Sequence, residues 1–456
     1  MDTTLLYITY YVLLAGLGAL MVYGMRIEGG RRSPGILLWL TLLVVFVIPA
    51  GISPLIDAHG LGARIGTFHP ARSAFLFPGL AFAYGFSVLF LLTRMVTIRR
   101  EDRWLPDPGD RELTEVLREH TAPRVATAMF LLGCAALAMT VLARIQAGGG
   151  QIRGRPEGGG LLALATFLTI TAGSGMLHVW LRARRPTAIA FGGVLFFCFM
   201  LNPSRSAILP AVGPFALLVV YGGRRGAMGA LLLIGGLGLA YVFFAFLQIV
   251  RWFGMDLFSS PEALTLLAER LVAGQGEFQA HWSYYFALER GHELDTFMEL
   301  GAVRRTLLMP IPTGLTGGIK PLDPNNELAL ACYPEWSSSQ YFATLHPLAF
   351  GSAYLDMGWA GVLMGVAWGL VLHGQMKLGG PQSLSRRLLW LGPVCTFWVL
   401  VGRGTVYAAS TLLVGGLIAT TLVEWVALHR VRYPRVESSS GSPARPRALN
   451  TRRSGP

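Results

Sequence analysis

The chain has 456 residues, of which 53% are hydrophobic and only 14% are charged, and its formal net charge is +13. Soluble globular chains carry about 25% charged residues, so this composition excludes an ordinary soluble fold and favours one integral membrane domain. The positive charge is dispersed between apolar segments rather than gathered on one face. That distribution argues against nucleic-acid binding and favours topology signals and contacts with anionic lipids or lipid phosphates.

Eleven apolar runs predict transmembrane helices, because about 20 helical residues cross the hydrocarbon core of a bilayer. The first run is expected to be a retained helix, since no basic region precedes it and no small-residue cleavage site follows it. The fold class predicted is therefore an all-α polytopic membrane protein. The runs lie near residues 4–24, 35–56, 73–97, 123–146, 160–182, 186–202, 205–222, 229–250, 346–372, 387–402 and 405–428.

The distribution of basic residues predicts the orientation of these helices. With the N-terminus outside, 25 Lys and Arg residues lie in or beside the cytoplasmic connections and the C-terminal tail, against 7 in the short outer connections. Because cytoplasmic loops carry an excess of Lys and Arg, we expect a periplasmic N-terminus and a cytoplasmic C-terminus in a bacterial inner membrane. The chain then divides into transmembrane helices 1–8 (1–250), a periplasmic loop (251–345), helices 9–11 (346–430) and a disordered basic tail (431–456).

The periplasmic loop is long and has folded character. Ser260-Pro261-Glu262 is typical of a helix start, with a cap, a proline in the first turn and an acid at the positive end of the helix dipole. A second amphipathic stretch follows around Trp282, and several Pro and Gly residues between 310 and 321 predict irregular structure. We therefore expect a partly helical lid lying on the membrane surface.

The chain has four cysteines and no arrangement typical of a cofactor site. Three of the cysteines fall in apolar runs and Cys332 stands alone in the loop, so neither a disulfide framework nor a metal site is predicted. The sequence also has no phosphate-binding loop and no dinucleotide fingerprint. ATP-driven transport is therefore not expected.

Arginines at the outer ends of helices are the most informative polar residues. Arg205 and Arg403 lie in minimal turns, Arg251 follows the eighth run directly, and Arg144 ends the fourth. A cluster of guanidinium groups at one membrane depth suits a phosphate-bearing lipid, because the planar group binds phosphate oxygens bidentately. The alternative is that each side chain reaches from a helix end to the headgroups with no ligand at all.

A second group of candidates lies in the loop and at the start of the ninth run. His346 is placed to act as a general base at the outer boundary, or else is simply an interfacial histidine with a hydrogen bond. Asp356 is a functional candidate because carboxyls inside membrane helices are rare, and a structural role is equally open. Each candidate in the loop can also be explained as an ordinary surface charge. These candidates are Arg270, Glu277, His281, Arg304, Arg305, Lys320 and Glu335.

Three local segments resemble oligosaccharide repeat-unit polymerases, the Wzy-type O-antigen and exopolysaccharide polymerases. Residues 304–321 (RRTLLMPIPTGLTGGIKP) are similar to a stretch of the family's main periplasmic loop. Residues 346–361 (HPLAFGSAYLDMGWAG) are similar to the start of the following helix, and 202–208 (NPSRSAI) to a short Ser-Arg-Gly turn. The chain departs from the family at Pro312, where a Pro-Arg pair is usual.

The resemblance implies a membrane glycosyltransferase with an architecture like that of the GT-C enzymes. Such a protein transfers a glycan from one undecaprenyl pyrophosphate to a lipid-linked repeat unit, without metal or nucleotide. Its partners would be these lipid-linked glycans, membrane lipids, and candidates such as a chain-length regulator and a flippase. On this hypothesis Arg205, Arg251 and Arg403 hold the diphosphate, and His346 or Glu277 acts on the acceptor, while the lid closes the site with Arg270, Arg304, Arg305 and Lys320.

Two other functions remain open from the sequence. An O-antigen ligase would use the same donor and a similar histidine, but it would deliver the glycan to lipid A core or another acceptor. A secondary transporter would have broken helices at the bilayer midplane and commonly inverted repeats. The sequence has few charges in the middle of its apolar runs and no evident repeat, which favours an enzyme.

Overall fold

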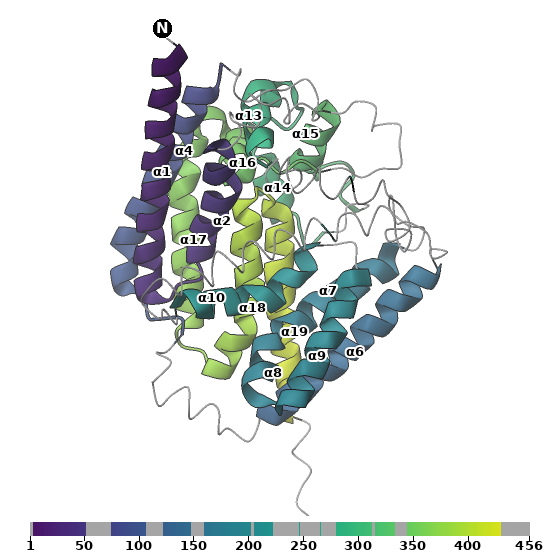
Figure 1. Ribbon diagram of the computed structural model, residues 1–456. Helices are drawn as coiled ribbons and strands as arrows, with labels where there is room; N and C mark the ends of the chain where they lie inside the picture. The colour runs from purple at the N-terminus through teal and green to yellow at the C-terminus, as the bar shows by residue number, and fades with distance from the viewer. Residues whose placement is uncertain are drawn as a thin grey trace, which may run out of the picture.

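The computed structural model describes residues 3–51, 74–105, 122–146, 159–201, 205–221, 246, 265, 280–311, 315–332 and 344–429. Every regular element within these ranges is a helix (Figure 1). Within the described residues, seven helices are long and apolar enough to cross a membrane. The chain is therefore a helical, multi-pass membrane protein, as its composition predicts.

The candidate spans coincide with predicted apolar runs. Three shorter apolar helices, Ile36–Gly51, Arg185–Leu201 and Leu209–Leu218, match three further runs. Apart from residue 246, the run near 229–250 lies outside the described residues, so a total of eleven spans stays a prediction. The seven spans are Leu5–Arg31, Leu76–Arg100, Pro123–Ala143, Leu164–Leu181, Leu348–Gly379, Leu384–Gly402 and Val406–Ala427.

The helices are interrupted at few places, and glycine accounts for two of them. Gly175 separates α7 from α8, and Gly358 (φ +58°) follows the last residue of α16. In chain order the α-helices are α1 (Thr3–Arg31), α2 (Ile36–Leu42), α4 (Leu76–Thr97), α6 (Ala122–Gln146), α7 (Gly159–Ser174), α8 (Met176–Arg182), α9 (Arg185–Leu201), α10 (Leu209–Tyr221), α13 (Ala280–Arg290), α14 (Gly301–Leu307), α15 (Pro324–Cys332), α16 (Leu348–Met357), α17 (Met364–Gly379), α18 (Leu384–Gly402) and α19 (Val406–His429). The shorter elements are η1 (Leu43–Val47), η3 (Ile98–Arg100), η4 (Arg205–Ile208), η7 (Gly291–Glu293) and η10 (Gly358–Leu363).

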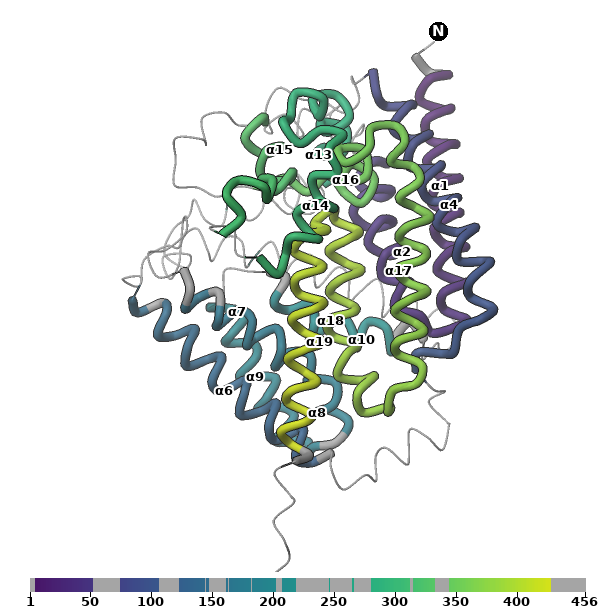
Figure 2. The backbone as a smooth tube through the Cα atoms, turned by 180° about the vertical axis from the view of Figure 1, so that it is seen from behind, coloured from purple at the N-terminus to yellow at the C-terminus, as the bar shows by residue number. Residues whose placement is uncertain are grey.

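Helices α18 and α19 form the middle of the bundle. In Figures 1 and 2, α1, α2, α4 and α17 lie on one side of this pair, and α6, α7, α8 and α9 lie on the other. The loop helices α13, α14 and α15 lie at the end where the chain begins, which we call the loop end. The last helix finishes at the opposite end, the tail end, so the described chain begins and ends on opposite sides of the bundle.

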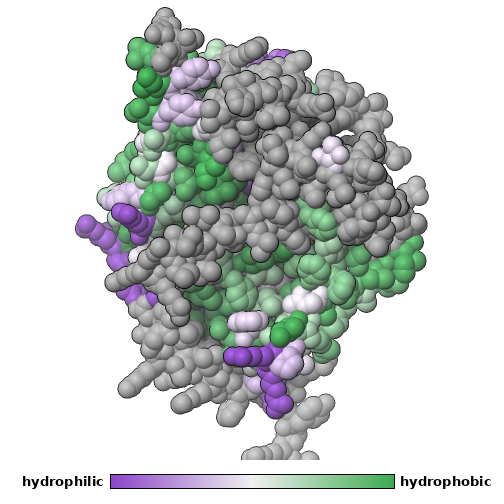
Figure 3. Space-filling view, in the orientation of Figure 1, coloured by the Kyte–Doolittle hydropathy of each residue, from purple (hydrophilic) through white to green (hydrophobic). Residues whose placement is uncertain are grey.

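The flanks of the bundle carry apolar side chains. Figure 3 shows green, apolar side chains over the visible flank, with the most strongly hydrophilic side chains at the left edge and near the bottom. Exposed large apolar side chains are unfavourable in water and expected in lipid. Examples from different helices are Leu92, Val96, Leu131, Ile189, Phe197, Ile418 and Leu422.

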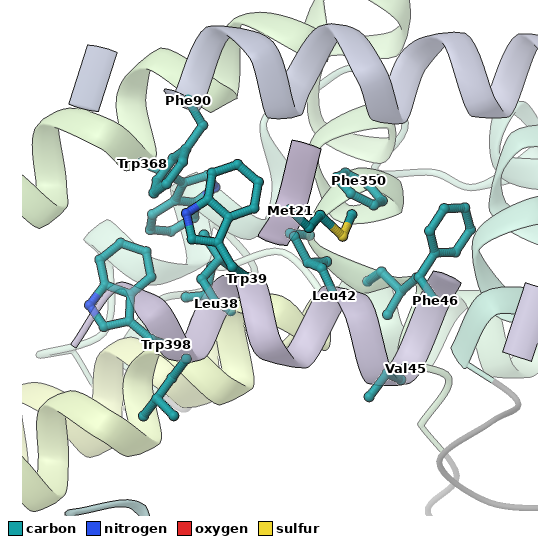
Figure 4. Close-up of a cluster of buried hydrophobic side chains, with 14 of the residues drawn as sticks. Met21, Leu38, Trp39, Leu42, Val45, Phe46, Phe90, Phe350, Trp368 and Trp398 are labelled. Atoms are coloured by element: carbon teal, nitrogen blue, oxygen red, sulfur yellow. The ribbon is translucent and has the colours of Figure 1, made fainter. Parts of the chain in front are cut away.

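A buried aromatic cluster joins the helices on the α1 side to α18 (Figure 4). The Trp39 and Phe90 rings pack edge to face with their centroids 5.1 Å apart, and Phe90 lies 6.4 Å from Trp398. Gly24 of α1 faces Trp39, and a Cβ at that glycine would lie 2.4 Å from the indole. The glycine therefore lets the two helices approach closely, as small residues do in membrane bundles.

The aromatic stretch around Trp282 forms α13, but this helix is not spread on a surface. All residues from 280 to 288 are buried. The Tyr284 hydroxyl donates to the carbonyl oxygen of Gly79 in α4 at 2.7 Å, and its ring packs against Phe46 at 5.5 Å. The helix is inserted among α4, η1 and α16 because its apolar residues surround it on all sides, and this part of the loop is anchored in the bundle.

At the tail end, a buried ionic cluster joins α1, α4 and α17. Arg94 of α4 donates to both carboxylate oxygens of Glu28 (2.6 and 3.1 Å) and of Glu101 (2.5 and 2.7 Å). His373 Nδ1 lies 2.6 Å from Glu101 Oε1. Arg94, Glu28 and Glu101 are all buried, so each charge depends on its partners for compensation.

The ionic cluster predicts a large effect of Arg94→Met on stability. Removing the guanidinium leaves the buried Glu28 without its cation and Glu101 with only His373, which costs about 3–5 kcal/mol. Thermal and denaturant unfolding in detergent would measure the loss. Arg100→Met is the matched control because Arg100 is exposed at the end of the same helical segment, and its stability should stay within about 0.5 kcal/mol of the wild type. Equal stabilities of the two variants would contradict this role for Arg94.

Candidate functional site

The turn between α18 and α19 carries Arg403 and is held tightly. The Arg403 N–H donates to Val399 O at 3.1 Å, and the Gly404 N–H donates to Val401 O at 2.9 Å. The Arg403 carbonyl in turn accepts the Leu348 N–H at 3.1 Å. The turn is therefore fixed against the first residue of α16, and Arg403 itself is half-buried.

Gly404 is required at this turn by its conformation and by its surroundings. Its φ is +85°, a region that residues with a side chain rarely adopt, and a Cβ there would lie 2.5 Å from the Leu348 carbonyl oxygen. Leu348 also has a positive φ, +63°, which is strained for a branched residue. Such strain persists where surrounding contacts hold it, and it is commonest at functional sites.

The loop helix α15 is tied to the same turn. The buried amide of Asn325 donates through Nδ2 to the Gly404 carbonyl oxygen at 3.1 Å, and its backbone carbonyl accepts the Leu345 N–H at 3.1 Å. Asp323 Oδ1 accepts the Asn325 N–H at 3.0 Å, which caps α15 just before Pro324 at its first position. Asn325 thus connects the loop, the Arg403 turn and the segment carrying His346.

Two cations of the loop share one aromatic ring at the start of α19. The guanidinium carbon of Arg305 lies 4.6 Å from the centroid of the Tyr407 ring, and Lys320 Nζ lies 5.2 Å from it. Lys320 is buried and donates to the Ile311 carbonyl at 3.1 Å, while Arg305 donates to the Pro321 carbonyl. Cation–π contacts of this kind hold both charges beside the Arg403 turn.

The charge in this region is predominantly positive. Among the described residues no carboxylate forms an ion pair with Arg305 or Lys320, and the buried Nε of Arg305 has no hydrogen-bond acceptor there. Asp323 acts on Arg305 from a longer distance. The first turn of α19 adds the partial positive charge of a helix N-terminus. A buried lysine and a half-buried arginine without ion-paired carboxylates, beside such a terminus, are suited to bind an anion.

His346 lies two residues before Leu348, whose N–H donates to the Arg403 carbonyl. Its Nε2 is 3.5 Å from the Thr344 hydroxyl, at the limit of a hydrogen bond. The ring is half-buried. The structure therefore brings the backbone of His346 into the same region as Arg403 and Asn325. The role of His346 as a base stays a prediction.

Other predicted residues are engaged elsewhere. Arg304, next to Arg305, points to the surface and pairs with Glu299 at 3.1 Å, an exposed pair of small energetic value. Asp356 is buried and its Oδ1 accepts the Ala302 N–H at 2.8 Å, so it caps the start of α14. Of the two roles left open for Asp356, these contacts favour the structural one. His281 is buried in α13.

Several predicted residues cannot be placed in this site. Arg205 begins η4, which packs against α7, α9 and α10, and its side chain lies outside the described part of the chain, as does that of Arg144. Their membership of the site stays a prediction. The same holds for residues outside the described ranges, namely Arg251, Arg270, Glu277 and Glu335.

Three features of the structure are missing from the sequence hypothesis. Tyr407, the shared ring, lies four residues after Arg403, and an aromatic residue at a membrane boundary could have indicated it. Asn325 gives no such signal, because its role depends on a contact across 79 residues of sequence. The ionic cluster could have been found from Arg94, a charge inside the predicted run 73–97.

These observations define a class of protein: a helical multi-pass membrane protein with a cationic site at the loop end of its bundle. Comparison with protein-family models, with curated proteins and with solved structures finds no match to this chain. The function therefore has to be argued from the site itself.

Gly404→Ala tests the close approach at the turn. The added Cβ meets backbone and the positive φ becomes strained, so we expect a loss of at least about 2 kcal/mol in the free energy of unfolding. Gly374→Ala is the matched control, because Gly374 lies within α17 and a Cβ there meets nothing within 4 Å. That change should be neutral or stabilise by about 0.5–1 kcal/mol. Unfolding in detergent measures both, and a neutral Gly404→Ala would refute the constraint.

The carboxyls of the loop predict a pH dependence. Burial raises the pKa of Asp323, and this effect is larger than the lowering by the Asn325 N–H and by Arg305. Burial also raises the pKa of Glu327, and this effect is larger than the lowering by hydrogen bonds from Thr296. A carboxyl with a raised pKa binds its proton more tightly in the folded state. The folded loop should therefore gain stability as the pH falls from above the raised pKa of the folded state to the unfolded value of about 4.

Hydrogen exchange of residues 295–332 at pH 4.5 and pH 7.5, corrected for the intrinsic rate, would measure this dependence. Protection should be greater at the lower pH, and Asp323→Asn should reduce the difference because the amide keeps the acceptor oxygen without the titratable charge. Stronger protection at pH 7.5 in the wild type would show that the sign is wrong.

Proposed function

We propose that the loop-end site binds the diphosphate of a lipid carrier and that the protein transfers the glycan attached to it, as a polysaccharide polymerase of the inner membrane. The observation that carries this proposal is the pair of cations on Tyr407, which has no carboxylate partner among the described residues. A diphosphate bears several negative charges, and arginine and lysine bind its oxygens directly. The resemblance of residues 304–321 and 346–361 to repeat-unit polymerases supports the same site.

The positions of basic residues support the loop end as the periplasmic face. The tail end is rich in them, and basic residues mark the cytoplasmic side of a membrane protein. A periplasmic loop end would place the cationic site where glycan polymers are assembled. The basic residues at the ends of described helices on the tail side include Arg26, Arg31, Arg32, Arg99, Arg100, Arg182, Arg184, Arg185, Lys377, Arg386 and Arg387.

The chemistry of transfer explains why cations are needed. As the glycosidic bond to the diphosphate breaks, negative charge grows on the departing phosphate oxygens, and fixed cations stabilise that charge. Arg305 and Lys320 are held on Tyr407, so little reorganisation is needed during the reaction. The acceptor hydroxyl must meanwhile be positioned and lose its proton. His346 is the base in this proposal, because its segment is hydrogen-bonded to both Asn325 and the Arg403 turn.

Two alternative functions, a ligase and a secondary transporter, make different demands on the structure. A ligase would bind the same donor in this site, and its mutant would accumulate unattached polymer rather than single repeat units. A secondary transporter would place charges at the midplane. The ionic cluster does not fit that requirement, since Glu28 and Arg94 each lie three residues before the end of their helices.

Substitutions in the loop test the proposal in the native host. With the chromosomal copy deleted, a plasmid carrying Arg305→Ala or Lys320→Ala should reduce polymer formation by about 10²- to 10³-fold, the usual effect of removing a stabilising group. Single repeat units should remain on the carrier, as measured by mass spectrometry of lipid-linked intermediates. Arg304→Ala is the matched control, since its side chain is turned to the surface, and polymer length should be normal.

Arg205→Ala extends the test to a residue whose side chain is not described. We expect it to abolish polymer while single repeat units accumulate. Polymer of normal length would remove Arg205 from the site. Normal polymer in both Arg305→Ala and Lys320→Ala would overturn the proposed function.

A further inference from the structure

The segment that supplies Arg305 and Lys320 also exposes an apolar patch. We define this patch as Leu307, Ile311, Leu315, Ile319 and Leu322. Leu307 and Leu315 are 75% and 78% exposed, more than almost any other large apolar side chain of the described chain. Five such residues within one short segment are unfavourable in water, and a patch of this kind marks an interaction surface.

The packing of α14 sets the depth of the patch. This helix, which ends at Leu307, packs against α19, one of the candidate membrane spans. Arg305 lies against Tyr407, the second residue of that span. Figure 2 shows α14 beside the loop end of α19, below α13 and α15 in that view. The patch therefore lies at the level where α19 enters the bilayer.

Charge accompanies the apolar side chains. Arg304, whose side chain is exposed and also pairs with Glu299 at 3.1 Å, lies three residues before Leu307. Lys320 is buried and held by Tyr407 and the Ile311 carbonyl, so it does not reach the headgroups. Exposed apolar side chains with neighbouring cations are the pattern of segments that lie in the membrane interface. Their apolar atoms enter the boundary with the acyl chains, and their cations meet anionic headgroups.

We infer that the apolar patch inserts into the bilayer leaflet at the loop end, among anionic phospholipid headgroups, and so holds α14 and the described residues 315–322 to the membrane. The occupant of the patch is the lipid surface itself. The inference needs only that α19 spans the membrane. A further step rests on the proposed function. If the site binds a carrier lipid, the inserted patch lets the lipid chain stay in the bilayer while its diphosphate reaches Arg305.

Spin labels test the insertion in nanodiscs that contain no glycan substrate, so the result is independent of the enzymatic proposal. The four cysteines, all free thiols, would be replaced by Ala, and single labels introduced as Leu307→Cys, Leu315→Cys and Ile319→Cys. The collision rate of each label with oxygen, which concentrates in lipid, is divided by its collision rate with a nickel chelate, which stays in water. A high ratio places the label in lipid. Glu293→Cys provides the water-facing control and Leu131→Cys, exposed on the flank of α6, the lipid-facing control.

In nanodiscs of phosphatidylethanolamine and phosphatidylglycerol, the ratio of oxygen to nickel collisions at the three patch labels should exceed that at Glu293→Cys several-fold. Ratios equal to the Glu293→Cys value at all three positions would overturn the inference. In phosphatidylcholine alone the ratios should fall, because the exposed Arg304 then has no anionic headgroup beside it. An unchanged ratio there would overturn the assignment of anionic headgroups.

Discussion

The packing of Arg305 and Lys320 on the Tyr407 ring is the interaction on which the functional argument depends. It fixes two cations of the loop at the first turn of a membrane helix, with no carboxylate ion pair among the described residues. Burying such charges is costly unless an anion compensates them. Asp323 interacts electrostatically with Arg305 but forms no ion pair with either cation among the described residues. An anionic ligand is the simplest compensation, and a lipid diphosphate fits both the charge and the depth.

The rest of the loop end serves to hold these cations. The approach of Gly404 to Leu348, the Asn325 bond to the turn and the cap that Asp356 provides for α14 connect the loop, α16 and α19 in one network. The insertion of α13 into the bundle anchors the loop from its other end. At the tail end, the ionic cluster around Arg94 performs the same task for α1, α4 and α17. The two ends thus use polar groups differently: one set pairs its guanidinium with two carboxylates, and the other holds cations without an ion pair among the described residues.

Much of the fold could be predicted from the sequence because hydrophobic length is a local property. The candidate spans fall on predicted runs, and so do the shorter apolar helices from Arg185 and Leu209. The site was only partly predictable. Arg403, Lys320 and Arg305 were candidates because of their chemistry, but nothing local separates Arg305 from its neighbour Arg304, since their roles differ by the side of α14 on which each lies. Asn325 and Tyr407 act through contacts with distant segments. The sequence hypothesis also took α13 as a surface helix, because aromatic residues suit an interface as well as a core.

The most direct measurement is an experimental structure of the protein in a nanodisc with undecaprenyl pyrophosphate, or a soluble diphosphate in its place. The account predicts phosphate density within hydrogen-bond distance of Arg305, Lys320 or Arg403, at the start of α19. Diphosphate density at the tail end, or at the loop end away from all three cations, would contradict it.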